Sequence, residues 1–534
     1  MADSWEDLDI DDLEKMVDAK FGEKSNHEKG GRTAANLWYP DESDAIASET
    51  VLTSWNVAYT YHSGRVDSSN LPALPSLGEL AVDPNGVPAQ AVLASSFYPF
   101  NPSFLCHFPR GIPLFVCVQG ENKAVKRFFG LEVQDMQFDK EGFVHTGTSE
   151  LCTKCMPEDN PRKCPTELFV KTCKCPSPEL NNVQWIFPQL QGNDIMHSKL
   201  MLLRFPGCVR LVVSSLNLSV RQWSNAGDSF WWADLPLKPE PCFDEEPLVQ
   251  QPLLDTLRRW GLKDSWLVLL PFCDWSSLQK CKSHVQMVTS VPGGVSDRIQ
   301  YGMERLHQCL KFLPKFPPST ECPVDVQVWS LGGATDSWYS DLARTLTQEK
   351  FSNLGLLADW KSDHVRFIFQ EKGGGTNWRE YQEKLCEEDN FLRFVFGQDE
   401  RRTPSTEIKK VMWDEIDNLL LKPQKGIPIS PWGWHSKVMT RTYPVGFCKK
   451  PGCKQVHGWR YIGSHNCSRA SWGWSYFDRS SKTIVMDPPR NWEMGVILTS
   501  LPALSPDEEC GVDLSAVAPL PFQPEKLMRT FPYR

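Results

Sequence analysis

The stretch IMHSKLMLLRF, residues 195–205, decides how the rest of this sequence is interpreted. Its apolar run predicts a β-strand, on which one residue separates His197 from Lys199. Side chains repeat every two residues along a strand, so the two point to the same face. A pair of this kind is often part of an ordinary solvated strand face. Whether it belongs to a site depends on a partner elsewhere in the chain.

A second copy of the motif supplies that partner. HSKVM at residues 435–439 repeats HSKLM at residues 197–201, and both copies continue downstream as S-x-N-x-S-x-x-x-W. The lysine-to-asparagine spacing is 18 positions in the first copy and 29 in the second, a difference explained by the insertion FCKKPGCKQVH. Two solvated strand faces have no reason to share so long a pattern, so we interpret the copies as two half-sites. The repeated serines and asparagines are Ser215, Asn217, Ser464 and Asn466.

Duplicated histidine, lysine and asparagine suit displacement at phosphorus. One imidazole can attack the phosphate while the other, on the opposite side, protonates the leaving oxygen. Two lysines and two asparagines can hold the equatorial oxygens. The sequence has no dense cluster of Asp and Glu of the kind that builds a two-metal centre. The chemistry is therefore predicted to need neither a metal nor another cofactor.

Composition indicates a soluble globular protein. Of the 534 residues, 41% are hydrophobic and 23% charged. The sequence contains no run of 18 or more apolar residues, so no membrane-spanning helix is predicted. The acidic N-terminus lacks the apolar core of a signal peptide. We expect an intracellular protein with no membrane association. Its 18 cysteines are then free thiols or metal ligands rather than disulfides.

The net charge of −9 comes from the start of the chain. Residues 1–50 hold 14 acids and 5 bases, which leaves 52 acids and 52 bases for the remainder. This segment is predicted to be an acidic, disordered tail. Apolar residues between Leu8 and Phe21 fall at roughly helical spacing, so a short helix that docks a protein partner is the alternative to a solubilising tail.

Beyond the tail, apolar runs bounded by Gly, Pro or Asn predict strands, and segments such as RIQYGMERLHQCLKFL predict helices. KLMLLRF and VRLVVSS are expected to form a hairpin or a close strand pair. This mixture of elements implies an α/β or α+β architecture with large mixed sheets. Because the motif is duplicated, we expect the α/β class, with two similar mixed-sheet domains related by a pseudo-two-fold axis around one shared site. We place the first domain at residues 51–283, with an insertion at about 145–175. The second is placed at residues 284–534, with an insertion at about 447–457.

At these motifs the sequence resembles the phospholipase D superfamily, which has a duplicated H-x-K motif with a downstream asparagine. It is more similar to the tyrosyl-DNA phosphodiesterase family that acts on 3′ ends, because neither copy is followed by the aspartate of the longer phospholipase motif. LASSFYPFNPSFLCHFP, SVPGG, VWSLGG and WEMGVIL also resemble that family. The resemblance runs from about residue 50 to the C-terminus and implies a phospholipase D-like fold, in which each domain is a mixed-sheet α-β-α sandwich.

The resemblance also implies roles for the repeated residues. His197 is the expected nucleophile, which forms a phosphohistidine with the 3′ end of DNA. His435 is the expected general acid, which later activates the hydrolytic water. The residues expected to hold the phosphate are Lys199, Lys437, Asn217 and Asn466, and Ser215 and Ser464 are counted among the substrate-binding residues.

The family commonly orients its histidines with a glutamine in the first half and a glutamate in the second. Glu493, in WEMGV, matches the glutamate. Asp228, in SNAGDSFWW, stands where the glutamine is expected. A carboxylate there would raise the pKa of an imidazole where an amide would not. Which histidine it affects is left open by the sequence.

Two cysteine-rich insertions predict structural zinc, with free thiols as the alternative. The first offers five cysteines, with His145 as a further candidate: Cys152, Cys155, Cys164, Cys173 and Cys175. The second offers only three ligands, spaced C-x4-C-x3-H: Cys448, Cys453 and His457. Both insertions are expected to lie near the site and to shape substrate access.

Among the 21 tryptophans, Trp432 and Trp434 in PWGW are the candidates for stacking on unpaired bases. Trp223 and Trp472, which recur in both copies, are expected to pack beneath the site.

Together these features predict a DNA-repair phosphodiesterase that removes topoisomerase-derived tyrosyl peptide or other blocks from DNA 3′ ends, single-stranded or nicked. It is expected to be a monomer in the nucleus, with the cytoplasm as a second location. The alternatives are another nucleic-acid end-processing or phospholipid phosphodiesterase, or a non-catalytic DNA- or protein-binding scaffold.

Overall fold

The computed structural model describes part of the chain, and the structural statements below concern that part alone. The described residues are 38, 55–59, 77–96, 108, 112–118, 144–145, 183–186, 188, 190, 194–217, 228–242, 248–262, 265–280, 282–294, 300–317, 322–328, 336–348, 365–368, 420–423, 435–478, 483–518, 520 and 527–529.

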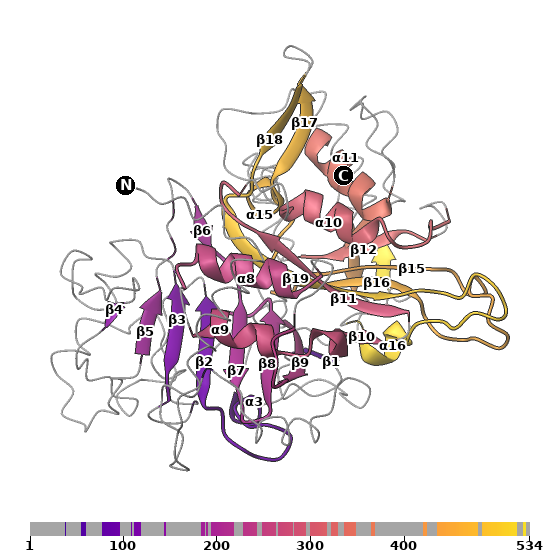
Figure 1. Ribbon diagram of the computed structural model, residues 1–534. Helices are drawn as coiled ribbons and strands as arrows, with labels where there is room; N and C mark the ends of the chain where they lie inside the picture. The colour runs from indigo at the N-terminus through magenta and orange to yellow at the C-terminus, as the bar shows by residue number, and fades with distance from the viewer. Residues whose placement is uncertain are drawn as a thin grey trace, which may run out of the picture.

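The first sheet is built from the N-terminal half, in the indigo to magenta part of Figure 1. Its eight described strands have the order β1-β9-β8-β7-β2-β3-β5-β4. The sheet is mixed, because β3 pairs in parallel with β2 and β5 while the other neighbours are antiparallel. The strands are β1 (Trp55–Tyr59), β2 (Ala91–Ser96), β3 (Leu114–Val118), β4 (Val144–His145), β5 (Val183–Ile186), β7 (Leu200–Arg204), β8 (Cys208–Ser214) and β9 (Ser229–Pro236).

The central strands of this sheet are buried along their whole length. This explains why LFVCV in β3 and LMLL at the start of β7 are continuous apolar runs rather than alternating ones. Helices α8 (Gln250–Arg259) and α9 (Trp266–Leu269) belong to the same core as the sheet (Figure 1). The expected hairpin is confirmed, since β7 and β8 pair antiparallel across Pro206 and Gly207.

The second sheet is built from the C-terminal half. Its ten described strands follow the order β10-β11-β19-β16-β15-β12-β13-β14-β20, with β6 also paired to β19. Parallel pairs (β12–β13, β13–β14 and β6–β19) occur among antiparallel ones. The strands are β6 (Ile195–Met196), β10 (Gln279–Lys280), β11 (Ser283–Ser290), β12 (Val324–Gln327), β13 (Val365–Ile368), β14 (Leu420–Pro423), β15 (Val438–Thr442), β16 (Gly458–Gly463), β19 (Asn491–Ser500) and β20 (Leu527–Arg529).

Helices α10 (Gly302–Leu310) and α11 (Asp336–Thr347) pack with the second sheet in a core of their own, and β17 (Trp474–Asp478) and β18 (Thr483–Asp487) form a separate hairpin (Figure 1). The remaining helices are α3 (Leu77–Leu80), η7 (Leu270–Phe272), η8 (Trp275–Leu278), α15 (Arg469–Trp472) and α16 (Leu514–Val517). None of the helices in the described ranges is long and apolar enough to span a membrane.

The two sheets meet in one core. Buried residues of the first sheet, such as Trp231, belong to the same cluster as Val285 and Met494 of the second. Trp260 of the first half packs edge-on against Trp492, with ring centroids 6.4 Å apart. The expected fold class, α/β with two mixed sheets, is confirmed; the domain limits stay a prediction.

One residue of the predicted acidic tail packs on this core. The Trp38 ring lies edge-on to Phe115 and Trp266, with centroid distances of 5.7 and 5.4 Å. The packed part of the chain therefore begins before residue 51.

Candidate active site

The first half-site lies where β6 leads into β7. β6 pairs in parallel with β19 of the second sheet, and the backbone N–H of His197 donates to the Trp492 carbonyl at 3.0 Å. This pairing holds the first H-x-K motif against the second half of the chain. Ser95 of β2 fixes the segment between β6 and β7, because its hydroxyl donates to the Ser198 carbonyl at 3.1 Å and accepts from the Leu200 N–H at 2.9 Å.

The second half-site repeats this arrangement before β15. Here Gln327 of β12 takes the place of Ser95: its amide donates to the Ser436 carbonyl at 3.1 Å and its Oε1 accepts from the Ser436 hydroxyl. In both halves the motif lysine folds back onto the carbonyl of the motif histidine. Lys199 Nζ donates to the His197 carbonyl at 2.6 Å, and Lys437 Nζ to that of His435.

The asparagines also occupy equivalent places. The strand after each H-x-K strand runs back antiparallel, β8 beside β7 and β16 beside β15. The residue three before each asparagine donates to the motif lysine's carbonyl: Ser214 N–H to Lys199 at 3.1 Å, and Gly463 N–H to Lys437 at 3.4 Å. Asn217 and Asn466 therefore follow the strands that return to the two motifs.

Each histidine is hydrogen-bonded to a carboxylate from the other half of the chain. His197 Nδ1 lies 2.7 Å from Glu493 Oε2, and His435 Nδ1 lies 3.0 Å from Asp228 Oδ1. The carboxylate side chains are fully buried, whereas the His197 and His435 side chains are 13% and 15% exposed. The sequence left open which histidine Asp228 affects, and the structure shows that it is hydrogen-bonded to His435.

Buried hydroxyl and amide groups fix both carboxylates. Ser215 Oγ donates to Asp228 Oδ1 at 2.7 Å, and Ser464 Oγ donates to Glu493 Oε2. This corrects the expectation that these two serines bind substrate, since both are fully buried with their hydroxyls directed to carboxylates. Ser471 Oγ and Asn491 Nδ2 donate to Glu493 Oε1, each at 3.0 Å.

The carboxylates select the histidine tautomer. An ionised carboxylate can only accept, so Nδ1 of each ring carries the proton and Nε2 keeps its lone pair. Burial lowers the pKa of His197 to about 4: Glu493 opposes the shift and Lys199 adds to it. Burial and Lys437 lower the pKa of His435 to about 4, against Asp228. Both imidazoles are therefore neutral at neutral pH when no anion is bound.

The two buried lysines would be stabilised in their charged forms by a bound anion. Burial lowers the pKa of Lys199 to about 8 and that of Lys437 well below its usual range, while Glu493 and Asp228 act in the opposite direction. Burial alone would raise the pKa of Glu493, yet the contact with His197, together with the neighbouring His465 and Lys199, holds it at about 2. A phosphodiester anion between the lysines would favour their charged forms.

His465, which the motif analysis missed, lies beneath the site. It is fully buried, with Nε2 2.9 Å from Ser290 Oγ and Nδ1 2.5 Å from the Tyr461 hydroxyl. Its ring stacks on buried Trp472 at 4.1 Å, so Trp472 packs beneath the site as expected. Burial lowers its pKa to about 3. The available signal was its place beside Asn466, where the first copy has a leucine.

The remaining predicted residues divide between two places. Cys448, Cys453 and His457 come together with Cys510, at the opposite ends of β15 and β16 from the histidine motifs. The expectation that this insertion lies near the site is wrong, because β15 leads away from Lys437 before the insertion begins. The others lie outside the described residues: Cys152, Cys155, Cys164, Cys173, Cys175, Trp223, Trp432 and Trp434.

This geometry can support a two-step displacement. Each imidazole keeps its Nε2 unprotonated and is oriented by a fixed carboxylate. The buried Lys199 and Lys437 lie close enough to both histidines to lower the pKa of each. One Nε2 can act as a nucleophile while the other transfers a proton.

Comparisons with known proteins find relatives for part of the sequence. A sequence model of the family described as tyrosyl-DNA phosphodiesterase matches residues 156–387, which include the first H-x-K copy and end before the second. A probable tyrosyl-DNA phosphodiesterase of Caenorhabditis elegans is 25% identical over 309 residues. That alignment covers 57% of this chain and 62% of the worm protein, so it spans less than two thirds of the relative.

Crystal structures of the yeast tyrosyl-DNA phosphodiesterase have a similar fold. One matches with a TM-score of 0.52 and 14% identity, covering 84% of this chain and 90% of the yeast chain. A mutant of the yeast enzyme matches with the same TM-score at 13% identity, covering 84% and 88%. The chain thus shares its fold with the yeast enzyme and, over residues 156–387, resembles the tyrosyl-DNA phosphodiesterases in sequence.

Proposed function

We propose that this protein is a DNA-repair phosphodiesterase that hydrolyses the bond between a DNA 3′ phosphate and a tyrosine, or another 3′ block, through a phosphohistidine. The crossed pair of histidine–carboxylate hydrogen bonds, with one H-x-K motif from each half, is the observation that supports it. The named relatives direct the proposal to tyrosyl-DNA among the phosphodiesters that such a site could cleave.

In the first step, His197 Nε2 attacks the phosphorus. A nitrogen–phosphorus bond forms and the bond from phosphorus to the tyrosyl oxygen breaks. Protonated His435 gives its Nε2 proton to that oxygen, so tyrosine leaves as a neutral phenol. The pKa of His435 is about 4 in the empty site, so this role requires the diester anion to raise it on binding, together with Asp228.

In the second step, His435 is neutral and removes a proton from water. The water oxygen bonds to phosphorus, the bond to His197 breaks, and a 3′ phosphate leaves. His197 returns to its starting tautomer because Glu493 still accepts from Nδ1. Lys199, Lys437, Asn217 and Asn466 stabilise the equatorial oxygens in both steps, without a catalytic metal.

Both half-sites belong to one chain, which supports a monomeric enzyme. A DNA substrate also makes the nucleus the expected location, with DNA ends and topoisomerase-derived peptide as partners. The acidic tail is the segment we assign to a protein partner.

The test is cleavage of a single-stranded oligonucleotide that carries a 3′ phosphotyrosine, in the presence of EDTA. We expect tyrosine release by the unaltered protein, none by His197→Ala, and a covalent protein–DNA adduct in His435→Asn, because that variant lacks the base of the second step. His307→Ala, on α10 and outside the site, is the matched control.

A folded protein with no turnover on 3′-blocked DNA would overturn the proposal. Hydrolysis of a phospholipid in the same assay series would favour the lipid alternative. Binding of DNA without turnover would favour the scaffold. Absence of the adduct in His435→Asn would reverse or void the two histidine roles.

A further inference from the structure

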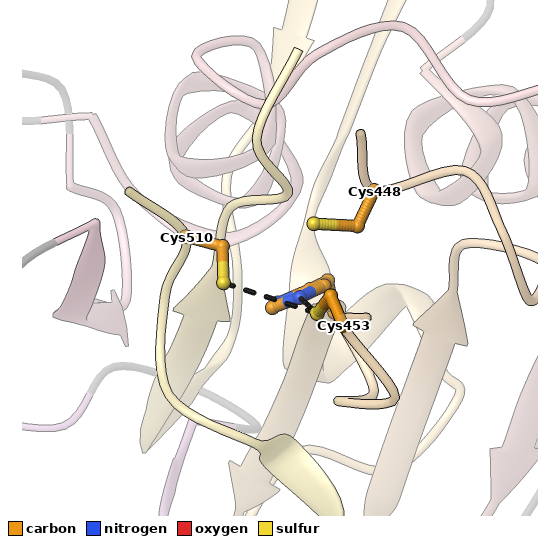
Figure 2. A group of neighbouring side chains, drawn as sticks. Cys448, Cys453 and Cys510 are labelled. Carbon is orange, nitrogen blue, oxygen red and sulfur yellow. Dashed lines mark hydrogen bonds between the residues drawn. The ribbon is translucent and has the colours of Figure 1, made fainter. Parts of the chain in front are cut away.

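A cluster of three cysteines and one histidine lies apart from the active site. Cys448 and Cys453 belong to the loop between β15 and β16, His457 immediately precedes β16, and Cys510 comes from the segment after β19. Figure 2 shows the Cys448, Cys453 and Cys510 side chains directed toward a common centre. One potential ligand atom from each of the four residues lies within 4.8 Å of the other three. The sequence motif offered only three ligands, and the fold supplies Cys510 as the fourth.

The separations within the cluster fit a tetrahedral ion. Zinc bonds of about 2.3 Å to sulfur and 2.0–2.1 Å to nitrogen place two sulfurs about 3.8 Å apart, and a sulfur and a nitrogen about 3.6 Å apart. Cys453 Sγ lies 3.9 Å from Cys510 Sγ and 3.4 Å from His457 Nε2. A disulfide would require about 2.05 Å. The cysteines are free thiols, already close to zinc-site spacing.

His457 is held in the tautomer that binds a metal. Its Nδ1 lies 2.9 Å from Ser500 Oγ, and the Ser500 hydroxyl donates its one proton to the Val512 carbonyl at 2.6 Å. Ser500 Oγ must therefore accept from His457 Nδ1–H. The lone pair is left on Nε2, the atom that faces the cysteines. A polar partner behind a ligating histidine is the usual support of a zinc site.

The loop is shaped to bring its two cysteines together. Pro451 and Gly452 lie in a turn in which the Cys453 N–H donates to the Lys450 carbonyl at 3.1 Å, and Gly452 has φ +72°. Proline followed by a left-handed glycine is the pattern of a type II turn. The Ala503 N–H donates to Cys448 Sγ at 3.3 Å, a contact that would also stabilise a metal-bound thiolate.

The segment carrying Cys510 is fixed beside the loop by its backbone. Lys449 N–H donates to the Ala503 carbonyl at 2.8 Å, and Leu514 N–H to the Val456 carbonyl at 2.9 Å. A Cβ on Gly511 would lie 2.5 Å from Ser500 Oγ, so the absence of a side chain there permits the close approach. Exposed Gln455 Oε1 accepts from the Cys510 thiol at 3.1 Å. Turning that amide over would donate N–H to a thiolate instead.

We propose that Cys448, Cys453, His457 and Cys510 bind one structural zinc ion, which clamps the β15–β16 loop to the segment after β19. Three sulfurs and one imidazole nitrogen in a tetrahedron favour zinc, and four protein ligands leave no open position for catalysis. Ser500, which contacts His457, lies seven residue steps along β19 from the active-site carboxylate of Glu493, a separation of about 23 Å. The ion therefore stabilises the far ends of β15, β16 and β19 and takes no part in the phosphodiester reaction.

The experiment is metal analysis of the purified full-length chain and three variants. Cys510→Ser should bind about one zinc equivalent less than the unaltered protein, since it lacks one of four ligands. Cys510→His restores a fourth ligand and should retain that equivalent. Cys242→Ser, a free cysteine outside the cluster, is the matched control. Any zinc bound by residues 145–175 would be the same in every variant. A difference in zinc content between variants therefore measures the zinc at this cluster alone.

A second measurement applies if Cys510→Ser fails to fold. The unaltered protein, stripped of zinc and refilled with Co²⁺, should show the visible absorption of a tetrahedral site with sulfur ligands. Loss of zinc should lower the Tm by several degrees and leave cleavage of 3′-phosphotyrosyl DNA per folded molecule unchanged. Equal zinc in the unaltered protein and Cys510→Ser, a Cys453–Cys510 disulfide in protein alkylated under non-reducing conditions, or bound iron would each overturn the proposal.

Discussion

At the scale of single residues, the carboxylates that contact the two active-site histidines have different roles. Glu493 accepts four hydrogen bonds, from His197, Ser464, Ser471 and Asn491, and holds His197 in the tautomer that can attack. Asp228 raises the pKa of a group that has to carry a proton at the start of the proposed reaction. A carboxylate in place of the expected amide therefore favours the acid form of His435.

Replacing Asp228 by asparagine should distinguish the role of Asp228 from that of Glu493. Asp228→Asn removes the charge that raises the pKa of His435, so we expect cleavage to slow by roughly 10²-fold and the alkaline limb of the pH–rate profile to move to lower pH. A 3′ nitrophenyl phosphate needs little protonation of its leaving group and should recover most of the lost rate. The measurement is the pH dependence of kcat/KM on both substrates.

Glu493→Gln is the matched variant. It frees His197 to place its proton on Nε2, which blocks attack, so we expect a loss of roughly 10⁴-fold with either leaving group. Equal rescue of both variants by the nitrophenyl substrate would contradict the assignment of the two carboxylates.

At the scale of elements, the site depends on how closely β16 and β19 approach. Gly463 and Gly495 face each other in the register of these strands, with the Tyr461 side chain above them. A Cβ on Gly495 would lie 2.2 Å from the Tyr461 ring, and Tyr461 in turn holds His465. Glycine is required at this pair because the ring occupies the space of a side chain.

Gly495→Ala should therefore be destabilising. Overpacking of a buried site costs typically about 1–3 kcal/mol, and the displaced Tyr461 should also lower activity by shifting His465. Gly86→Ala is the comparison: it meets no atom within 4 Å, and only its φ of +80° is unfavourable, by about 1–2 kcal/mol. The measurement is denaturant unfolding with activity assayed alongside. Unaltered activity in folded Gly495→Ala would argue against a role for Tyr461 and His465 in supporting the active site.

At the scale of the whole molecule, two sheets, one shared core and an acidic N-terminal segment are combined in a single chain. Trp38 ties that segment to the first sheet, although the charge pattern alone assigns it to a solvated tail. The buried histidines make the stability of the folded protein depend on pH.

Deletions should show where the packed chain begins. Removal of residues 1–50 takes away Trp38 and should lower the Tm by several degrees, because a partly buried aromatic pair is lost from the core. Removal of residues 1–36 keeps Trp38 and should leave the Tm almost unchanged. Trp38→Ala in the full chain is the control and should match the longer deletion. Equal Tm values for both deletions would show that Trp38 contributes nothing.

Stability should fall as the pH is lowered from about 6.5. The pKa values of His197 and His435 are about 4 in the fold and that of His465 is about 3, against an ordinary 6.5. Between these values the unfolded chain binds more protons than the folded one. Stability present above pH 6.5 is therefore lost on acidification, at up to about 1.4 kcal/mol per pH unit for each histidine. Thermal unfolding at pH 7 and pH 5 at constant ionic strength measures this, and an equal Tm would contradict it.

The sequence by itself determined the duplication, the two H-x-K motifs, the two asparagines and the strand character around them. These are local patterns, and a near-identical copy makes them specific. Only the tertiary structure decided that Asp228 serves His435, that Glu493 serves His197 and that Cys510 completes the cluster. The partners lie 207, 296 and 57 residues apart, and strand pairing, such as that of β6 with β19, brings distant segments of the chain together. Periodicity reports which face of a strand a residue occupies, but not which distant strand lies beside it.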